Sequence, residues 1–132
     1  MELAVAAGDR VAADFLESRR LAAGDTSAEK RMWEMAVNGQ TYALTGLAGY
    51  YAQNGPKGNP MKAYAYSRVA EMRGDYKAAL TRDFVVNRPL TPMQRTEAEA
   101  KALTIFRAMT ELRRQRFGPN VPITDPRPLE VD

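Results

Sequence analysis

Apolar residues recur along most of this chain with the spacing of a helix. Up to about Gln115, alanine and long straight-chain residues dominate, β-branched residues are sparse, and alternation with a period of two is too short for a sheet. Glycine and proline divide this stretch into segments of roughly two to seven helical turns. The pattern predicts an all-α fold with helices at about 9–22, 27–37, 40–54, 60–73, 75–87 and 92–116.

Three of these helices begin with residues suited to capping. Asn59 precedes a proline at the first helical position, where the missing N–H is not needed. Thr91 is followed three residues later by Gln94, and Thr26 by Glu29, which is the spacing of a capping box. We therefore expect side-chain caps at all three positions.

The last predicted helix carries one apolar seam on an otherwise charged surface. The seam residues are spaced by four, three, four and three, and they are Ala98, Ala102, Ile105, Met109 and Leu112. A terminal helix of a helical array needs a polar outer face, so we interpret this element as a capping helix. Pairing of the seam with a second chain is the alternative. Arg113, Arg114 and Arg116, near its end, suit the negative end of its own dipole.

The residues after the last helix predict an extended tail over 117–132. Its four prolines, which oppose helix, are Pro119, Pro122, Pro126 and Pro128. The apolar side chains of Val121, Ile123 and Leu129 suit docking on the helices, and a free tail is the alternative.

The chain repeats itself when its glycines are aligned. Intervals of four, four and eight residues separate Gly8, Ala12, Leu16 and Gly24, and the same intervals separate Gly39, Ala43, Leu47 and Gly55. A third copy begins with Gly74 and Ala78. Self-similarity at this period is typical of helical solenoids, in which helix pairs stack to share one core.

The best-formed copy, about 39–74, resembles the Sel-one-like repeat, a tetratricopeptide-like α/α repeat. The matching positions are Gly39, Ala43, Leu47, Tyr51, Gly55, Lys62, Ala63, Tyr66, Ala70 and Gly74. Ala48 replaces the usual Gly, Tyr66 the common Trp, and in the first copy Arg31 takes the aromatic position. The resemblance implies a right-handed α/α solenoid of about three hairpins (8–37, 39–73 and 74–116) in a domain spanning 1–116.

Composition narrows the chemistry available to the chain. It has no Cys and no His, so thiolate catalysis, histidine bases and zinc sites built from these residues are excluded. No carboxylate pair suggests a metal or acid–base site, and we expect no catalytic residues, metal or cofactor. A net charge of +3 does not require a nucleic-acid partner. No apolar run is long enough to span a bilayer, and no signal peptide is visible, which leaves cytoplasm and periplasm both open.

The six tyrosines lie within 35 residues of the central repeat. Tyr51 and Tyr66 occupy packing positions, so we expect them in the core. In families like the one resembled here, the first helix of each pair lines a concave groove. The candidate partner-binding residues on this basis are Tyr42, Thr45, Gly49, Tyr50 and Gln53, together with Trp33 and Tyr64. Tyrosine covers much area at little entropic cost, and helix glycines permit close packing or close approach of a partner.

These observations favour a non-enzymatic module that binds a protein or peptide in its groove, as a monomer or weak dimer. The resemblance implies a bacterial adaptor or regulator. An immunity-type inhibitor of a specific effector and a structural terminal segment of a larger repeat protein are alternatives. An enzymatic function is the remaining alternative, because some cysteine-rich members of the resembled repeat family have been linked to β-lactam binding or hydrolysis. This chain lacks their cysteines.

Overall fold

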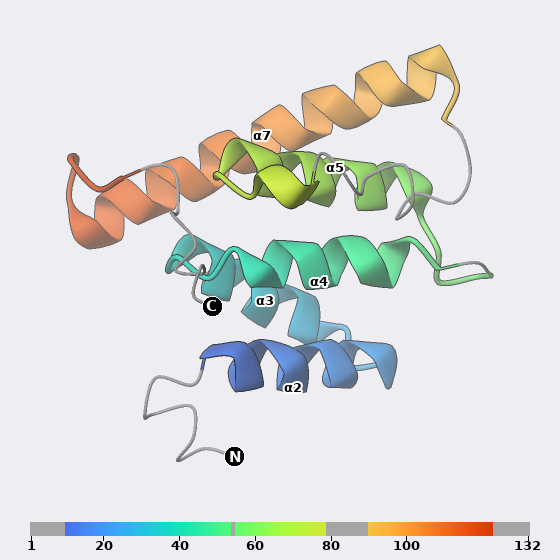
Figure 1. Ribbon diagram of the computed structural model, residues 1–132, viewed down its shortest axis with the longest axis horizontal. Coiled ribbons are helices and arrows are strands. Elements are labelled where there is room, and N and C mark those ends of the chain that lie inside the picture. Colours follow the sequence, from blue (N-terminus) through green and yellow to red (C-terminus); the bar gives the residue numbers. More distant parts are fainter. Residues whose placement is uncertain (1–9, 54, 79–89, 123–132) are drawn as a thin grey trace.

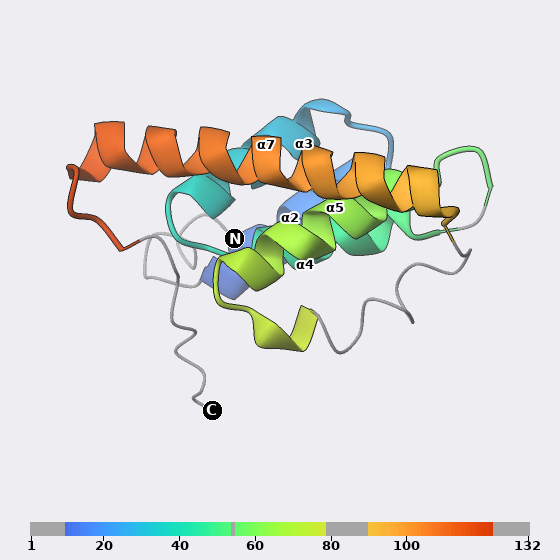
Figure 2. The ribbon, with the colours of Figure 1, turned by 90° about the horizontal axis from the view of Figure 1, so that it is seen from above.

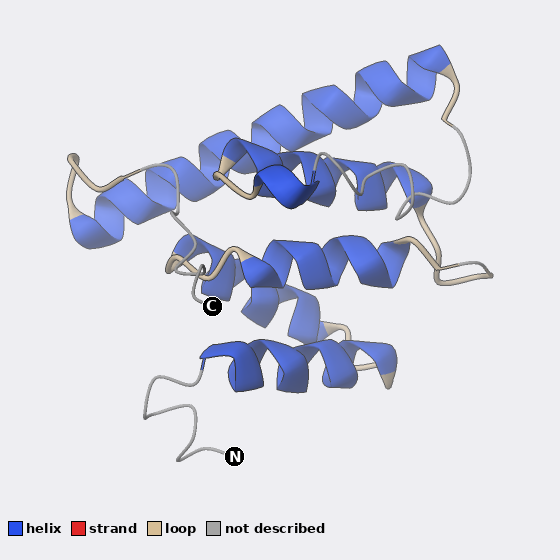
Figure 3. Cartoon of the chain, in the orientation of Figure 1, coloured by secondary structure: helices blue, strands red, loops and turns tan. Residues whose placement is uncertain are grey.

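The computed structural model describes residues 10–53, 55–78 and 90–122, and within them all regular structure is helical (Figure 3). The helices are α2 (Arg10–Ala22), α3 (Ser27–Val37), α4 (Tyr42–Tyr51), α5 (Pro60–Met72) and α7 (Pro92–Phe117). The predicted all-α class is confirmed. At the helix predicted for 75–87, the described residues are helical from Tyr76 to Ala78. The rest of the predicted range lies outside the described residues.

The helices stack from α2 at one end of the molecule to α7 at the other (Figure 1). Helices α2 and α3 pack as one pair and α4 and α5 as a second, and α4 contacts both helices of the first pair. Helix α7 packs along α5 and also contacts α3 (Figure 2). The long final helix therefore touches one helix from each pair.

Helices α3 and α5 end in the same backbone motif, 35 residues apart. Gly39 and Gly74 have φ values of 106° and 105°, which glycine adopts at no steric cost. The N–H of the next residue bonds back to the helix in both cases, from Gln40 to Met35 O and from Asp75 to Ala70 O, each at 2.9 Å. This pattern is a Schellman motif, and it confirms that the glycines end helices.

The predicted caps at Asn59 and Thr91 are present. Asn59 accepts a hydrogen bond from the backbone N–H of Lys62 at 3.1 Å. Thr91 and Gln94 form the reciprocal capping box, with bonds of 3.1 and 3.0 Å.

The prediction of a capping box at Thr26 is wrong. Thr26 makes no side-chain cap, and Asp25 instead accepts from the backbone N–H of Ser27 at 3.1 Å. Glu29, the expected partner of Thr26, is used elsewhere, because two tyrosines from later helices donate to its carboxylate.

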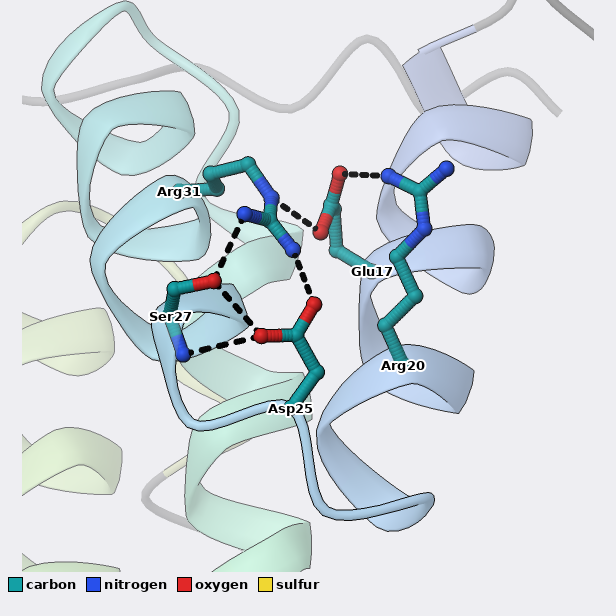
Figure 4. A network of polar contacts seen from close by, with 5 residues as sticks. All are labelled: Glu17, Arg20, Asp25, Ser27 and Arg31. Carbon is teal, nitrogen blue, oxygen red and sulfur yellow. Dashed lines mark hydrogen bonds and ion pairs between the residues drawn. The ribbon is translucent and has the colours of Figure 1, made fainter.

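A network of polar side chains joins α2 to α3 (Figure 4). Arg31 donates from Nε to Glu17 Oε1 and from Nη2 to Asp25 Oδ2, both at 2.7 Å. Glu17 also accepts from Arg20 at 2.9 Å, and Arg31 Nη1 donates to Ser27 Oγ at 2.8 Å. The hydrogen bonds from Ser27 and Arg31 hold the pKa of Asp25 below its ordinary value. Arg31 therefore joins α2 to α3 through charge-assisted hydrogen bonds.

The apolar seam of α7 faces the core of its own chain. Ala98, Ala102 and Met109 are fully buried, and Ile105 and Leu112 pack half-buried against the core. Most of the seam is thus buried within the molecule, which supports its interpretation as a capping helix.

Two arginines from later in the chain donate hydrogen bonds to backbone carbonyls at the end of α3. Arg113 donates from Nη1 to Val37 O at 2.7 Å, and Arg73, fully buried, donates from Nη2 to Ala36 O at 3.0 Å. Arg116 pairs with Glu34 of the same helix. The sequence alone predicts that Arg113 and Arg116 interact with the dipole of their own helix. The structure shows them at the carboxyl-terminal end of α3, which carries the same partial negative charge.

Replacing Arg113 by methionine is expected to lower the free energy of unfolding by about 1–3 kcal/mol, because a buried carbonyl loses its donor. Arg114→Met, at an exposed neighbouring position, should change it by less than about 0.5 kcal/mol. Urea unfolding followed by circular dichroism measures both. Equal stability of the two variants would show that Arg113 does not support α3.

Candidate functional site

Five of the predicted partner-binding residues lie on α4 or just after it. Thr45, Gly49 and Gln53 are exposed, and Tyr42 and Tyr50 are half-buried. Spacings of three and four residues place Tyr42, Thr45 and Gly49 on one face of the helix. We call these five residues the α4 surface. Helix α4 itself carries no charged residue.

Thr45 links the α4 surface to Asp75, just before the helical turn that begins at Tyr76. Its hydroxyl donates to Asp75 Oδ2 at 3.3 Å, and Asp75 is 5% exposed. The adjacent Tyr76 is 72% exposed, the second most exposed of the large apolar side chains among the described residues. Sequence reasoning left Tyr76 out, although the clustering of tyrosines pointed to it, because its exposure depends on packing between helices.

Tyr50 and Gln53 have structural as well as surface roles. The Tyr50 ring meets Tyr51 edge-on, with centroids 5.0 Å apart, and it packs against the core. Gln53 donates from Nε2 to the carbonyl of Tyr50 at 2.8 Å. This bond covers a carbonyl at the end of α4, where no helical donor remains.

Tyr64 lies apart from the α4 surface. It is buried beneath α7, where its hydroxyl donates to Glu99 Oε2 at 2.6 Å and Arg95 lies 5.8 Å above its ring. Its position is that of a packing residue between α5 and α7.

Trp33 lies on α3, in an open hollow of about 500 Å³. The hollow is lined by Thr26, Glu29, Lys30, Trp33, Glu34 and Tyr66. Helix α3 supplies most of this lining and α5 supplies Tyr66, so the hollow is separate from the residues of the α4 surface.

A carboxylate holds three helices together beside this hollow. Glu29 of α3 accepts from the hydroxyl of Tyr51 through Oε1 and from that of Tyr66, at 2.6 Å, through Oε2. Lys62 lies 3.6 Å from the same carboxylate and 4.7 Å from the centroid of the Tyr51 ring. The Tyr51 and Tyr66 rings stack 6.2 Å apart. Tyr66 belongs to the core as predicted, whereas Tyr51 is half-buried and packs against it. The hydroxyls of both bind Glu29, which sequence reasoning missed.

The electrostatics of this cluster follow from its hydrogen bonds. Burial acts to raise the pKa of Glu29, but the hydroxyls of Tyr51 and Tyr66 and the charge of Lys62 outweigh it and lower the pKa below 4.5, its ordinary value. Burial and the Glu29 carboxylate raise the pKa of both tyrosines well above their ordinary value. The ionised carboxylate and the neutral hydroxyls are therefore the forms that the fold stabilises.

Ser27 and Lys30 have the Ser-x-x-Lys spacing found in some β-lactam-reactive enzymes, which sequence reasoning overlooked. The Ser27 hydroxyl donates to Asp25 Oδ1 at 2.6 Å and accepts from Arg31. Because the pKa of Asp25 is lowered, its carboxylate is a weak base. This geometry favours a role in the α2–α3 network over that of a nucleophile.

Other site types are not evident in the part of the chain that the structure describes. It contains no group of three or more acidic side chains arranged to hold a metal ion. None of its helices is both long and apolar enough to cross a bilayer. Comparisons with protein-family models, curated proteins and solved structures found no match to this chain.

Glu29→Gln is expected to lower stability at neutral pH, and its deficit should narrow as the pH falls below about 4.5. The pKa of Glu29 is lower in the folded chain, so the unfolded chain takes up the proton first. The stabilisation is therefore complete above the ordinary pKa and is lost as the pH falls through the folded-state value. Urea unfolding at a series of pH values measures the difference. Glu97→Gln, on the exposed face of α7, is the control, and a pH-independent deficit for Glu29→Gln would contradict the linkage.

Two glycine substitutions are expected to have opposite effects on stability. A Cβ at Gly49 meets no atom of the described residues within 4 Å, so Gly49→Ala should raise the free energy of unfolding by up to about 1 kcal/mol. A Cβ at Gly58 would overlap the carbonyl oxygen of Gln53, so Gly58→Ala should lower it by about 1 kcal/mol or more. Thermal unfolding of both variants tests this, and a loss of stability in Gly49→Ala would mean that Gly49 is needed for packing.

Proposed function

We propose that this chain is a non-enzymatic binding module that holds a protein or peptide against the α4 surface. The observation that carries the proposal is Gly49. A glycine in a helix costs stability relative to alanine, and a Cβ built on Gly49 would meet no atom within 4 Å among the described residues, so their packing does not require a glycine there. Close approach of a partner's backbone is a physical reason to keep it there.

The side chains around Gly49 suit such an interface. Tyr42 and Tyr50 supply large aromatic area, and Thr45 and Gln53 supply polar groups beside it. Tyr76, exposed at the start of the helical turn that follows α5, extends the aromatic area. Because α4 has no charged residue, binding should depend on burial and hydrogen bonding more than on charge, and therefore should vary little with salt.

We further propose that the fold is a right-handed α/α solenoid of three hairpins related to the Sel-one-like repeats. The 35-residue offset between the helix ends at Gly39 and Gly74 supports this, as do the pairwise contacts of α2 with α3 and α4 with α5. Arg31 and Tyr66 are separated by the same offset, and each donates to a glutamate on an earlier helix. In this arrangement α4 is the first helix of the middle pair, and its exposed face belongs to the concave groove.

Affinity capture from a native lysate tests the binding surface. We expect the wild type to retain a partner that Gly49→Leu loses, because a branched side chain at Gly49 blocks close approach. Tyr42→Ala should weaken retention, since it removes aromatic area from the same face. Washing at two salt concentrations should leave the retained amount similar.

Ala108→Leu is the matched control, because it places the same side chain at an exposed position of α7. It should retain the partner as the wild type does, and circular dichroism should show that all variants are folded. Retention of the same partner by Gly49→Leu would overturn the proposed surface.

A further inference from the structure

The outer face of α7 carries a second regular pattern, on the side opposite the buried apolar seam. Helix α7 forms one end of the stack, and among the described helices it contacts only α3 and α5 (Figure 1). Residues at spacings of four, three, four, three and four lie along its exposed side, and they are Met93, Glu97, Ala100, Thr104, Arg107 and Glu111. We call these six residues the outer seam. All six are exposed, and Met93 is 73% exposed.

The middle of the outer seam permits close approach of another helix. Ala100 and Thr104 have short side chains, and the distance between two packed helices depends on the side chains at their contact. The Thr104 hydroxyl donates to Ala100 O of its own helix at 3.1 Å. Burial of this hydroxyl in an interface would therefore not leave it without a hydrogen-bond partner.

Opposite charges flank this middle at equal distances. Glu97 lies three residues before Ala100, and Arg107 lies three residues after Thr104. Neither Glu97 nor Arg107 forms a hydrogen bond or ion pair with another residue that the structure describes. A second α7 that runs antiparallel to the first would place Glu97 of each chain opposite Arg107 of the other, in two equivalent pairs. A parallel arrangement would instead place like charges together, so the charges favour the antiparallel one.

We infer that two copies of this chain pair through the outer seam, with their α7 helices antiparallel about a twofold axis between Ala100 and Thr104. An identical chain is the occupant that the charges specify, because it supplies both complementary groups at the required positions. A contact made by one helix face is small, so we expect a weak dimer with a dissociation constant of order 100 µM, and a monomer in the dilute solutions used for unfolding. Helix α4 does not contact α7, so the inference does not depend on the proposed function.

Charge reversal tests the pairing by sedimentation velocity of the full-length chain, from about tenfold below to about tenfold above this dissociation constant. Glu97→Arg and Arg107→Glu each turn two attractive contacts into two repulsive ones, so each should weaken self-association by about tenfold or more. An equimolar mixture of these two variants should associate as the wild type does, because the mixed dimer regains both pairs. Lys57→Glu is the control, since it changes the charge as much as Arg107→Glu does at an exposed position outside α7, and it should match the wild type. Circular dichroism should show that all variants are folded.

Disulfide formation tests the direction of the helices, because the chain has no cysteine of its own. Met93→Cys and Glu111→Cys, when mixed and oxidised, should form a disulfide between chains, since the two positions lie opposite each other in the antiparallel pair. Either variant alone should not, because its two cysteines would be about 27 Å apart along the helix axis. A wild type that stays monomeric throughout the concentration range would overturn the inference. So would an equal loss of association in Lys57→Glu, a mixture of the charge variants that does not associate, or a disulfide that forms as readily in either cysteine variant alone.

Discussion

The carboxyl-terminal end of α3 lies inside the protein, and its carbonyl groups must find donors there. The backbone N–H groups of Gly39 and Gln40 satisfy Ala36 O and Met35 O through the Schellman motif. Buried Arg113 of α7 donates to Val37 O, and buried Arg73, at the end of α5, adds a second donor to Ala36 O. The position of α7 across α3 and α5 follows from this requirement together with its apolar seam, since both must be satisfied at once.

Helix α3 makes many of the side-chain hydrogen bonds that join the helices, whereas α4 has no charged residue. Glu29, in the first turn of α3, binds Tyr51 of α4 and Tyr66 of α5, and the other end of α3 receives the arginines. The helix positions are thus specified by contacts on one side of the molecule. On the α4 surface, Gly49 is a residue that the packing of the described residues does not require.

Local patterns were sufficient to predict most of the helices and two of three caps, because periodicity, Asn59 and Thr91 act within a few residues of chain. Thr26 was misread because its neighbour Asp25 competes for the same backbone N–H, and Glu29 has partners far along the chain. Contacts between distant parts of the chain also limited what could be predicted of the candidate site. Spacing placed Tyr42, Thr45 and Gly49 on one face, but only tertiary packing shows Tyr64 beneath α7 and Tyr76 exposed beside Thr45.

The hydrogen bond from Arg113 to Val37 joins residues 76 positions apart, and that from Arg73 to Ala36 joins residues 37 apart. Closing such loops costs conformational entropy that short hairpins avoid, so the α2–α3 pair forms its contacts earlier than α3 gains its final donors. During synthesis the chain emerges from its amino terminus. Val37 O can therefore receive its donor from Arg113 only after α7 has left the ribosome.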